Sequence, residues 1–130
     1  MAKELPSIDA WLKEVKTEKP ASGIGMFLIH NGVVRETAKA AVREGRQDMP
    51  EVSGMEFSYD QEAVDQCIRE TLDMRGISCV RVWLNEGRLN VGDSIMLVLV
   101  GGDIRPHVVD ALQFLVGKIK NECVIEKELF

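Results

Sequence analysis

The chain has 130 residues, of which 45% are hydrophobic and 28% charged, a composition typical of one folded domain, 1–130, rather than of a disordered or fibrous chain. Its formal net charge of −5 argues against a general nucleic-acid binder, because such proteins carry an excess of basic residues. The longest apolar run, 95–100, is far too short for a membrane span, and the N-terminus lacks the apolar core of a secretory signal, so we expect a cytoplasmic protein.

The first predicted element is an amphipathic helix over residues 8–18. Ser7 precedes it with a side chain suited to the N-cap, and Lys19-Pro20 ends it, because the residue before a proline disfavours the α region. Four apolar residues recur at helical spacing along this segment: Ile8, Trp11, Leu12 and Val15.

The next predicted element is a strand over the apolar run 23–30. Asn31-Gly32 follows it, and this dipeptide favours a tight hairpin turn, so residues 33–35 are predicted to begin a return strand. Residues 43–53 are polar, contain a glycine and a proline, and have no apolar period. We therefore predict a mobile loop there.

A strand followed by a helix is predicted in the middle of the chain. Residues 54–59 alternate between apolar and polar, as in a half-buried strand, and Asp60 can cap the helix that follows. Arg75-Gly76 closes this helix. Its predicted inner face consists of Ala63, Val64, Cys67, Ile68, Thr71 and Leu72.

Residues 80–130 are predicted to form a compact unit of strand, Gly-rich turn, strand and helix. The segments 77–84 and 94–100 are rich in β-branched and apolar residues, and we expect them to pair as antiparallel strands across a turn at 85–93. Gly101-Gly102-Asp103 is predicted to break the second strand.

The last helix is predicted to be capped near Asp103, with Pro106 in its first turn, and to end at about Asn121. A short, exposed terminal strand follows at 123–129. Five apolar residues of this helix are available to face the sheet: Val109, Leu112, Phe114, Leu115 and Ile119. Strands mixed with two long helices, without a strict βαβ repeat, predict an α+β layer architecture with an antiparallel sheet and a short N-terminal helix.

Neither the cysteines nor the histidines suggest a metal centre. The three cysteines are widely spaced and include no CxxC pair, so we predict buried thiols rather than a disulfide framework or a zinc site. No motif for Ser-His or metal catalysis is present, and we predict no cofactor.

Four basic residues near the ends of elements are the candidate site residues: Arg35, Arg105, Lys120 and Lys127. Arg105 begins a helix, where backbone N–H groups favour an anion, although Asp103 opposes this. Each of the four can also be a solvated surface charge. If the chain turns back after the last helix, Lys120 and Lys127 could face one cleft. Mutual repulsion and partial burial would then lower their pKa values and make one of them a usable base or nucleophile.

These residues occur in an order that resembles a known family. The resembling segments are 25–35 (GMFLIHNGVVR), 91–100 (VGDSIMLVLV), Arg105, 111–114 (ALQF), Lys120 and Lys127. The Gly92-Asp93 hairpin and the lysine pair are the most specific parts. On these residues the chain resembles the large, catalytic subunit of molybdopterin synthase, the MoaE-like family, from about residue 23 to residue 127.

The resemblance implies an α/β hammerhead-type fold and a homodimer within a heterotetramer. The partner would be a small ubiquitin-like sulfur-carrier subunit, whose Gly-Gly C-terminus carries a thiocarboxylate. The implied reaction in molybdenum cofactor biosynthesis transfers sulfur to cyclic pyranopterin monophosphate to form molybdopterin. Arg35 and Arg105 would hold this pterin phosphate substrate, and Lys120 and Lys127 would be the reactive lysines.

A second function remains open. Leu84-Asn85 stands where the family usually has a His-Arg pair, Ile104 replaces a histidine, and Glu126 stands where a tryptophan usually precedes the second lysine. The alternative is a non-catalytic relative that acts as a dimeric binding module for a ubiquitin-like Gly-Gly tail. A third possibility is an unrelated small α+β protein.

Overall fold

The computed structural model describes residues 3–18 and 21–130 and contains two antiparallel sheets. The helices are α1 (Ile8–Glu18), α2 (Lys39–Glu44), α3 (Gln61–Leu72) and α4 (Arg105–Lys118), with a 3₁₀ turn at Ala21–Gly23 and a π-helical turn at Ile119–Cys123. The strands are β1 (Met26–Val33), β2 (Gly54–Tyr59), β3 (Ile77–Leu84), β4 (Gly87–Asn90), β5 (Ser94–Gly102) and β6 (Val124–Leu129). One sheet has the order β1-β5-β3 and the other β4-β2-β6.

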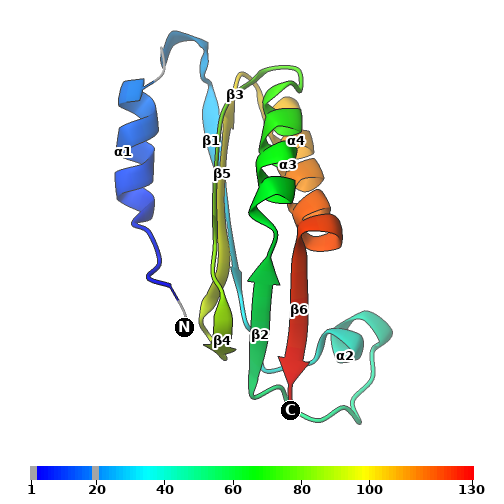
Figure 1. Ribbon diagram of the computed structural model, residues 1–130. Coiled ribbons are helices and arrows are strands. Elements are labelled where there is room, and N and C mark those ends of the chain that lie inside the picture. The colour runs from blue at the N-terminus through cyan, green and yellow to red at the C-terminus, as the bar shows by residue number, and fades with distance from the viewer. Residues whose placement is uncertain (1–2, 19–20) are drawn as a thin grey trace.

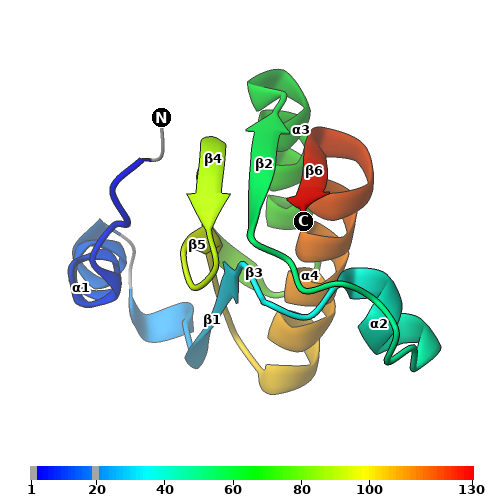
Figure 2. The same cartoon turned by 90° about the horizontal axis from the view of Figure 1, so that it is seen from below.

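Helices cover both faces of the first sheet. Figure 1 shows α1 on one side of β1, β5 and β3, with α3 and α4 on the other side. Helix α2 lies beside the end of β6 in Figure 1, and the view from below in Figure 2 shows that it projects to one side of the molecule. The predicted α+β class, with antiparallel strands and two long helices, is confirmed, and the strands divide between two sheets. In the described ranges, no helix is long and apolar enough to cross a membrane.

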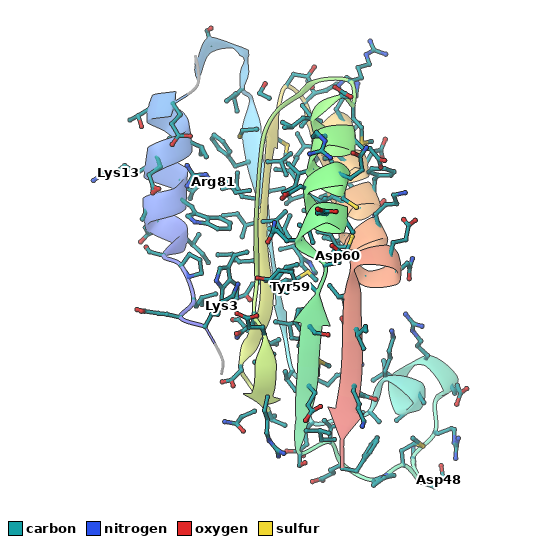
Figure 3. The ribbon with its side chains drawn as sticks, in the orientation of Figure 1. Lys3, Lys13, Asp48, Tyr59, Asp60 and Arg81 are labelled. Atoms are coloured by element: carbon teal, nitrogen blue, oxygen red, sulfur yellow. The ribbon has the colours of Figure 1, made fainter. Side chains whose placement is uncertain are left out.

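Helix α1 begins where the sequence predicts. The Ser7 hydroxyl accepts a hydrogen bond from the Ala10 backbone N–H at 3.1 Å, so it covers one of the unpaired donors of the first turn. Arg81 on β3 donates to Glu14 at 3.1 Å and to Glu18 at 2.9 Å, and these ion pairs attach α1 to the sheet (Figure 3). The predicted end at Lys19-Pro20 lies outside the described residues.

The hairpin predicted at Asn31-Gly32 is wrong. Strand β1 continues through both residues, which pair with Leu97 and Met96 of β5. The favoured hairpin turn needs a positive φ, and Gly32 is not among the residues with one, so the backbone stays extended. The predicted return strand is also absent, because β1 ends at Val33 after a bulge and the chain then leads to α2.

The polar segment predicted to be a loop overlaps the end of a short helix. Helix α2 ends at Glu44, and Gly45 follows it with a φ of 67°, a left-handed conformation that suits glycine at a helix end. From there to β2 no helix or strand is present, which agrees with the irregular part of the prediction.

Strand β2 and helix α3 agree with the sequence prediction. Asp60 is the N-cap of α3, and its carboxylate accepts hydrogen bonds from the N–H groups of Glu62 at 3.0 Å and Ala63 at 3.4 Å. Val64, Cys67 and Thr71 of the predicted inner face are buried. Leu72 is 40% exposed, so its assignment to that face was wrong.

Strands β3 and β5 pair antiparallel, as predicted, but the structure differs at both ends of β5. The predicted turn before it contains a short strand, β4, which pairs with β2. Gly101 and Gly102 extend β5 instead of breaking it. A Cβ at Gly101 would lie 2.6 Å from the Cys79 sulfur, and one at Gly102 would clash with the Gly76 carbonyl oxygen, so these glycines permit close packing inside the sheet.

Helix α4 packs on the sheet through Val108, Ala111 and Leu115, while Phe114, predicted to face the sheet, is 36% exposed. Ile104, not Asp103, is the N-cap, and it makes no side-chain capping hydrogen bond. The chain leaves α4 through the π-helical turn and then forms β6, the predicted terminal strand.

Candidate functional site

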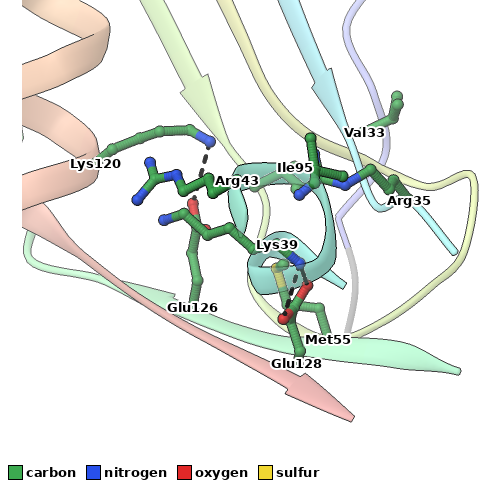
Figure 4. Close-up of a pocket in the computed structure, with 10 residues that line it drawn as sticks. Val33, Arg35, Lys39, Arg43, Met55, Ile95, Lys120, Glu126 and Glu128 are labelled. Carbon is green, nitrogen blue, oxygen red and sulfur yellow. Dashed lines mark hydrogen bonds and ion pairs between the residues drawn. The ribbon is translucent and has the colours of Figure 1, made fainter. Parts of the chain in front are cut away.

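A pocket of about 320 Å³ lies where the end of β1, the start of β5, helix α2, the π-helical turn and β6 meet (Figure 4). Most of its lining side chains are charged. The lining residues are Val33, Arg35, Lys39, Val42, Arg43, Met55, Ile95, Lys120, Glu126 and Glu128. Four of these are basic and two are acidic, so the lining has a net charge of +2 in a chain whose net charge is −5.

Arg35 reaches this pocket because the chain just before it is anchored. Val34 is 2% exposed, its N–H donates to the Asp93 carbonyl oxygen, and its own carbonyl accepts from Gly92. The Arg35 Nε donates to the Thr37 carbonyl oxygen at 2.9 Å, which orients the guanidinium and leaves its other N–H groups for a ligand.

Lys120 reaches the same pocket from the π-helical turn. Ile119 is fully buried and anchors this turn, and π-helical turns are frequent at functional sites. Lys120 Nζ lies 3.7 Å from Glu126 Oε1, with the lysine side chain 40% exposed and the glutamate side chain 17% exposed. The Glu126 Oε1 atom is buried and has no hydrogen-bond partner in the described part of the chain, so the lysine is its charge partner.

Helix α2 supplies two further cations, Lys39 and Arg43, that the sequence prediction missed. The Glu128 carboxylate accepts from the Lys39 backbone N–H at 3.0 and 3.3 Å and connects α2 to β6. One signal was available in the sequence, because Lys39 and Arg43 are four residues apart among good helix formers and so share a face of any helix there.

Lys127 does not join Lys120 in this pocket. Successive side chains of a strand point to opposite faces, so Lys127 points away from the side that carries Glu126 and Glu128. It lies opposite Glu56 of β2 and lines a separate hollow of about 250 Å³ together with Arg88. Within the described chain, the two lysines therefore do not face one cleft.

Arg105 also lies away from the pocket. It is the first residue of α4, and Lys120 follows 15 positions later, which corresponds to roughly 22 Å along a helix. At this end of α4, Asp103 accepts from the Ile104 N–H at 2.6 Å and lies 2.7 Å from His107 Nδ1. The hydrogen bond with His107 is the main cause that lowers the pKa of the Asp103 carboxyl.

His30 lies near the pocket but was not predicted as a site residue. Its Nε2 atom is buried and makes no hydrogen bond to any residue that the structure describes. Burial of the imidazole is the main cause that lowers the pKa of His30 from 6.5, and the charge of Lys120 is the second cause. Both effects favour a neutral imidazole next to the cationic pocket.

The cysteines are buried, as predicted. The sulfur atoms of Cys67 and Cys123 lie 3.4 Å apart, and burial is the main cause that raises the pKa of the Cys123 thiol to about 12. A thiol with this pKa is not a nucleophile at neutral pH. Residues 3–18 and 21–130 contain no group of three or more His, Cys, Asp and Glu residues arranged to hold a metal ion.

The arrangement is suited to bind an anion. Arg35, Lys39, Arg43 and Lys120 come from three separate parts of the chain and line one pocket, and charge-assisted hydrogen bonds from such groups to phosphate or carboxylate are strong. Of the four predicted site residues, the structure brings Arg35 and Lys120 together and leaves Arg105 and Lys127 elsewhere.

A protein-family model matches the chain. The family model described as "MoaE protein" matches residues 2–122, which is most of the chain. No curated protein matches the chain.

Several solved structures have the same fold but low sequence identity. Molybdopterin synthase from Staphylococcus aureus is 17% identical, with a TM-score of 0.71 over 91% of this chain and 83% of that chain. The molybdopterin biosynthesis MoaE protein from Burkholderia ambifaria MC40-6 is 18% identical, with a TM-score of 0.73 over 98% and 84%. The complex of subunits 1 and 2 of molybdopterin-converting factor from Helicobacter pylori 26695 contains a chain that is 16% identical, with a TM-score of 0.64 over 96% and 84%.

At these identities the solved structures establish a shared fold, and the match to the family model establishes the family. This family model covers almost all of the chain that forms the elements, the two antiparallel sheets and the basic pocket. The chain belongs to the MoaE protein family, and this membership supports a role in molybdenum cofactor biosynthesis.

Proposed function

We propose that this chain is the large subunit of a molybdopterin synthase and that it transfers sulfur from a small-subunit thiocarboxylate to cyclic pyranopterin monophosphate. The observation that carries the proposal is the meeting of Arg35 and Lys120, 85 positions apart in sequence, in one pocket with a net charge of +2. Both the thiocarboxylate and the phosphate are anions, and preorganised cations stabilise the charge that develops on a departing or attacking group.

Each proposed site residue has a distinct role. Arg35 would hold the substrate phosphate through the N–H groups that Thr37 does not occupy. Lys120 would contact the thiocarboxylate, with Glu126 behind it at 3.7 Å. Arg105 and Lys127 lie outside this pocket, and they would take part where the small subunit or a second copy of the chain extends the site to them.

The proposed partner is a small ubiquitin-like sulfur carrier, bound to a homodimer of this chain in a heterotetramer. The Helicobacter pylori structure is a complex of two subunits of molybdopterin-converting factor, and its fold similarity to this chain supports such a partner. We also propose a cytoplasmic location, because three buried cysteines suit a reducing compartment.

Reconstitution tests the proposed activity. The purified chain, a thiocarboxylated small subunit and cyclic pyranopterin monophosphate should together yield molybdopterin, measured by fluorescence of its oxidised derivative. Lys120→Ala should reduce the rate by about a hundredfold or more, because it removes a cation from the reacting centre.

Lys118→Ala is the matched control. Lys118 is the last residue of α4, two positions before Lys120, but it pairs with Glu122 at 2.8 Å and Glu70 at 3.7 Å and does not line the pocket. Its variant should retain nearly the full rate. Equal rates for the Lys120→Ala variant and the unaltered chain would contradict the proposed role of Lys120. A failure to form molybdopterin with any small subunit would contradict the proposed enzyme activity.

One observation favours the alternative of a binding module without catalysis. The two lysines expected to act together lie at separate hollows, and Lys120 is next to a carboxylate. In that case the small subunit should co-purify with the chain in a stable complex, while no molybdopterin forms. The same reconstitution therefore distinguishes the two functions.

A further inference from the structure

Helix α2 forms one wall of the pocket, and the segment that carries it is anchored at the start of the helix and again just before β2. Ala38, just before it, is 1% exposed, and the Glu128 carboxylate accepts from the Lys39 N–H. After the helix, Val52 N–H donates to the Glu36 carbonyl oxygen at 2.7 Å, which closes the segment into a loop. The side chains that α2 directs into the pocket therefore project from a backbone that is fixed in place.

Lys39 and Arg43 occupy one face of this helix, because residues four apart lie one above the other. Figure 4 shows their nitrogen-bearing ends directed into the same space as the Lys120 ammonium group. Arg46, which follows the helix, does not line the pocket and instead pairs with Asp48 at 3.3 Å and Glu44 at 3.8 Å. Lys39 and Arg43 thus line the pocket, whereas the nearby Arg46 does not.

Three of the four pocket cations lack an acidic partner. Within the described residues, no carboxylate lies within 4.0 Å of the charged nitrogens of Arg35, Lys39 or Arg43, whereas Arg81 and Lys118 each pair with two glutamates. The chain contains 21 acidic residues, so acidic partners are not scarce. Three unpaired cations around one hollow repel one another, and a bound anion would relieve that repulsion.

The net charge of the pocket indicates which kind of anion fits. Four cations and the two carboxylates of Glu126 and Glu128 leave +2. A phosphate monoester carries a charge of roughly −1.5 to −2 at neutral pH, because its second pKa is about 6, whereas a carboxylate or a phosphate diester carries only one negative charge. The guanidinium groups of Arg35 and Arg43 also match phosphate oxygens in a bidentate manner.

We propose that Lys39 and Arg43 make this pocket selective for a dianionic phosphate monoester over a phosphate diester or a peptide carboxylate. The inference rests on the proposed function, whose substrate carries a cyclic phosphate, that is, a diester. Addition of one water molecule to that ring breaks one P–O bond and yields a monoester and an alcohol. The α2 wall therefore binds the ring-opened form more tightly than the cyclic one.

Binding measurements on the full chain test the selectivity without any sulfur transfer. Isothermal titration calorimetry at about pH 8 would compare phenyl phosphate, the six-membered cyclic diester trimethylene phosphate, and a peptide ending in Gly-Gly. Phenyl phosphate should bind about tenfold more tightly than either monoanion, and its affinity should fall as salt is added.

Variants of α2 then assign the selectivity to its cations. The double variant Lys39→Met with Arg43→Met keeps the aliphatic bulk, and it should weaken phenyl phosphate binding at least about tenfold and remove the preference over the cyclic diester. Arg46→Met, the matched control on the same segment, should bind as the unaltered chain does. Glu126→Gln should bind phenyl phosphate more tightly, because it removes a negative charge from the lining.

The outcomes separate this inference from the proposed function. Equal affinity for monoester and diester would overturn the inference. So would an equal loss of affinity in the Arg46→Met variant and in the double variant, or tighter binding of the Gly-Gly peptide that depends on Lys39 and Arg43. If molybdopterin forms while the monoester preference is absent, the inference fails and the function stands. If the preference is present and no product forms, the function fails and the inference stands. Circular dichroism confirms that each variant is folded.

Discussion

At the scale of single residues, ion pairing distinguishes two lysines that lie only two positions apart. Lys118 Nζ is 2.8 Å from Glu122, a contact that raises the lysine pKa and occupies the ammonium group. Lys120 Nζ is 3.7 Å from Glu126, which is beyond hydrogen-bond distance, so its three donors remain available to a ligand. The sequence places both lysines at the end of one helix, and only the contacts assign them different roles.

His30 provides a pH-dependent test of the same neighbourhood. Its pKa is lowered from 6.5 by burial first and by Lys120 second, so near pH 6 the unfolded chain binds more protons than the folded chain. The free energy of unfolding is therefore at its full value above pH 6.5 and decreases as the pH falls through that value toward the lowered pKa. We expect His30→Gln to reduce the loss of stability between about pH 7.5 and about pH 5.5.

Urea denaturation at the two pH values measures this difference. The carboxylate of Asp103 does not interfere, because its pKa is lowered from 3.8 and its contribution is lost only at more acidic pH. If the variant loses as much stability as the unaltered chain between the two pH values, His30 is not the titrating group.

At the scale of elements, local signals located α1 and α3 accurately, because caps and apolar stripes act over a few residues. Asp60 is the clearest case, since its carboxylate accepts from two N–H groups of the first turn of α3 (Figure 3). We expect Asp60→Ala to lower the free energy of unfolding by about 1 kcal/mol, within the usual range of roughly 0.5–2 kcal/mol for a lost N-cap. Chemical denaturation monitored by far-UV circular dichroism measures the change.

Asp60→Asn is the conservative control for the cap. Asparagine is about as good an N-cap residue as aspartate, so this variant should stay close to the unaltered chain in stability. A loss as large in Asp60→Asn as in Asp60→Ala would show that the charge of Asp60, rather than the capping hydrogen bonds, stabilises α3.

Elements defined by long-range pairing were predicted less well. Asn31-Gly32 has the local signature of a turn, but eight consecutive residues of β1 pair with β5, and these ladder hydrogen bonds outweigh the turn preference. Strand β4 has only four residues, and it forms because β2 provides a partner. Helix α2 was missed because its six residues are too few for a clear apolar period and its anchor, Glu128, comes from the end of the chain.

At the scale of the whole molecule, β5 connects two hydrophobic clusters. Met96, Val98 and Val100 belong to the cluster beneath α3 and α4, whereas Leu99 packs with Val15 of α1 on the opposite face of the sheet. Since adjacent residues of one strand serve both clusters, the two faces are expected to unfold together.

Leu99→Ala tests this coupling. Leu99 is fully buried, so its truncation should cost about 2–5 kcal/mol of unfolding free energy. Tryptophan fluorescence, which includes the signal of Trp11 on α1, and far-UV circular dichroism should still give coincident urea transitions.

Ile125→Ala is the surface control for this substitution. Ile125 is 71% exposed, so its variant should change stability by no more than about 0.5 kcal/mol. Separate transitions for the two probes in the Leu99→Ala variant would show that α1 and its cluster unfold independently of the rest of the chain.

The amino-acid sequence was enough to predict the class of the fold, the helices α1 and α3, and the strands β2, β3 and β6, because these depend on the spacing of apolar residues and on caps within one segment. Through its resemblance to a family it also identified Arg35 and Lys120, which line the candidate pocket. These features depend on residue type and order within a single segment, and not on contacts with distant segments.

Which charged side chains lie together depends on how the chain folds in three dimensions. It joined Arg35 and Lys120 with Lys39 and Arg43 of α2, and it directed Lys127 to the other face of β6, because a one-residue step along a strand reverses the side chain. These outcomes depend on the register of β6 against β2 and on the anchoring of α2 by Glu128. Contacts between distant segments set both, and no local pattern in the sequence encodes them.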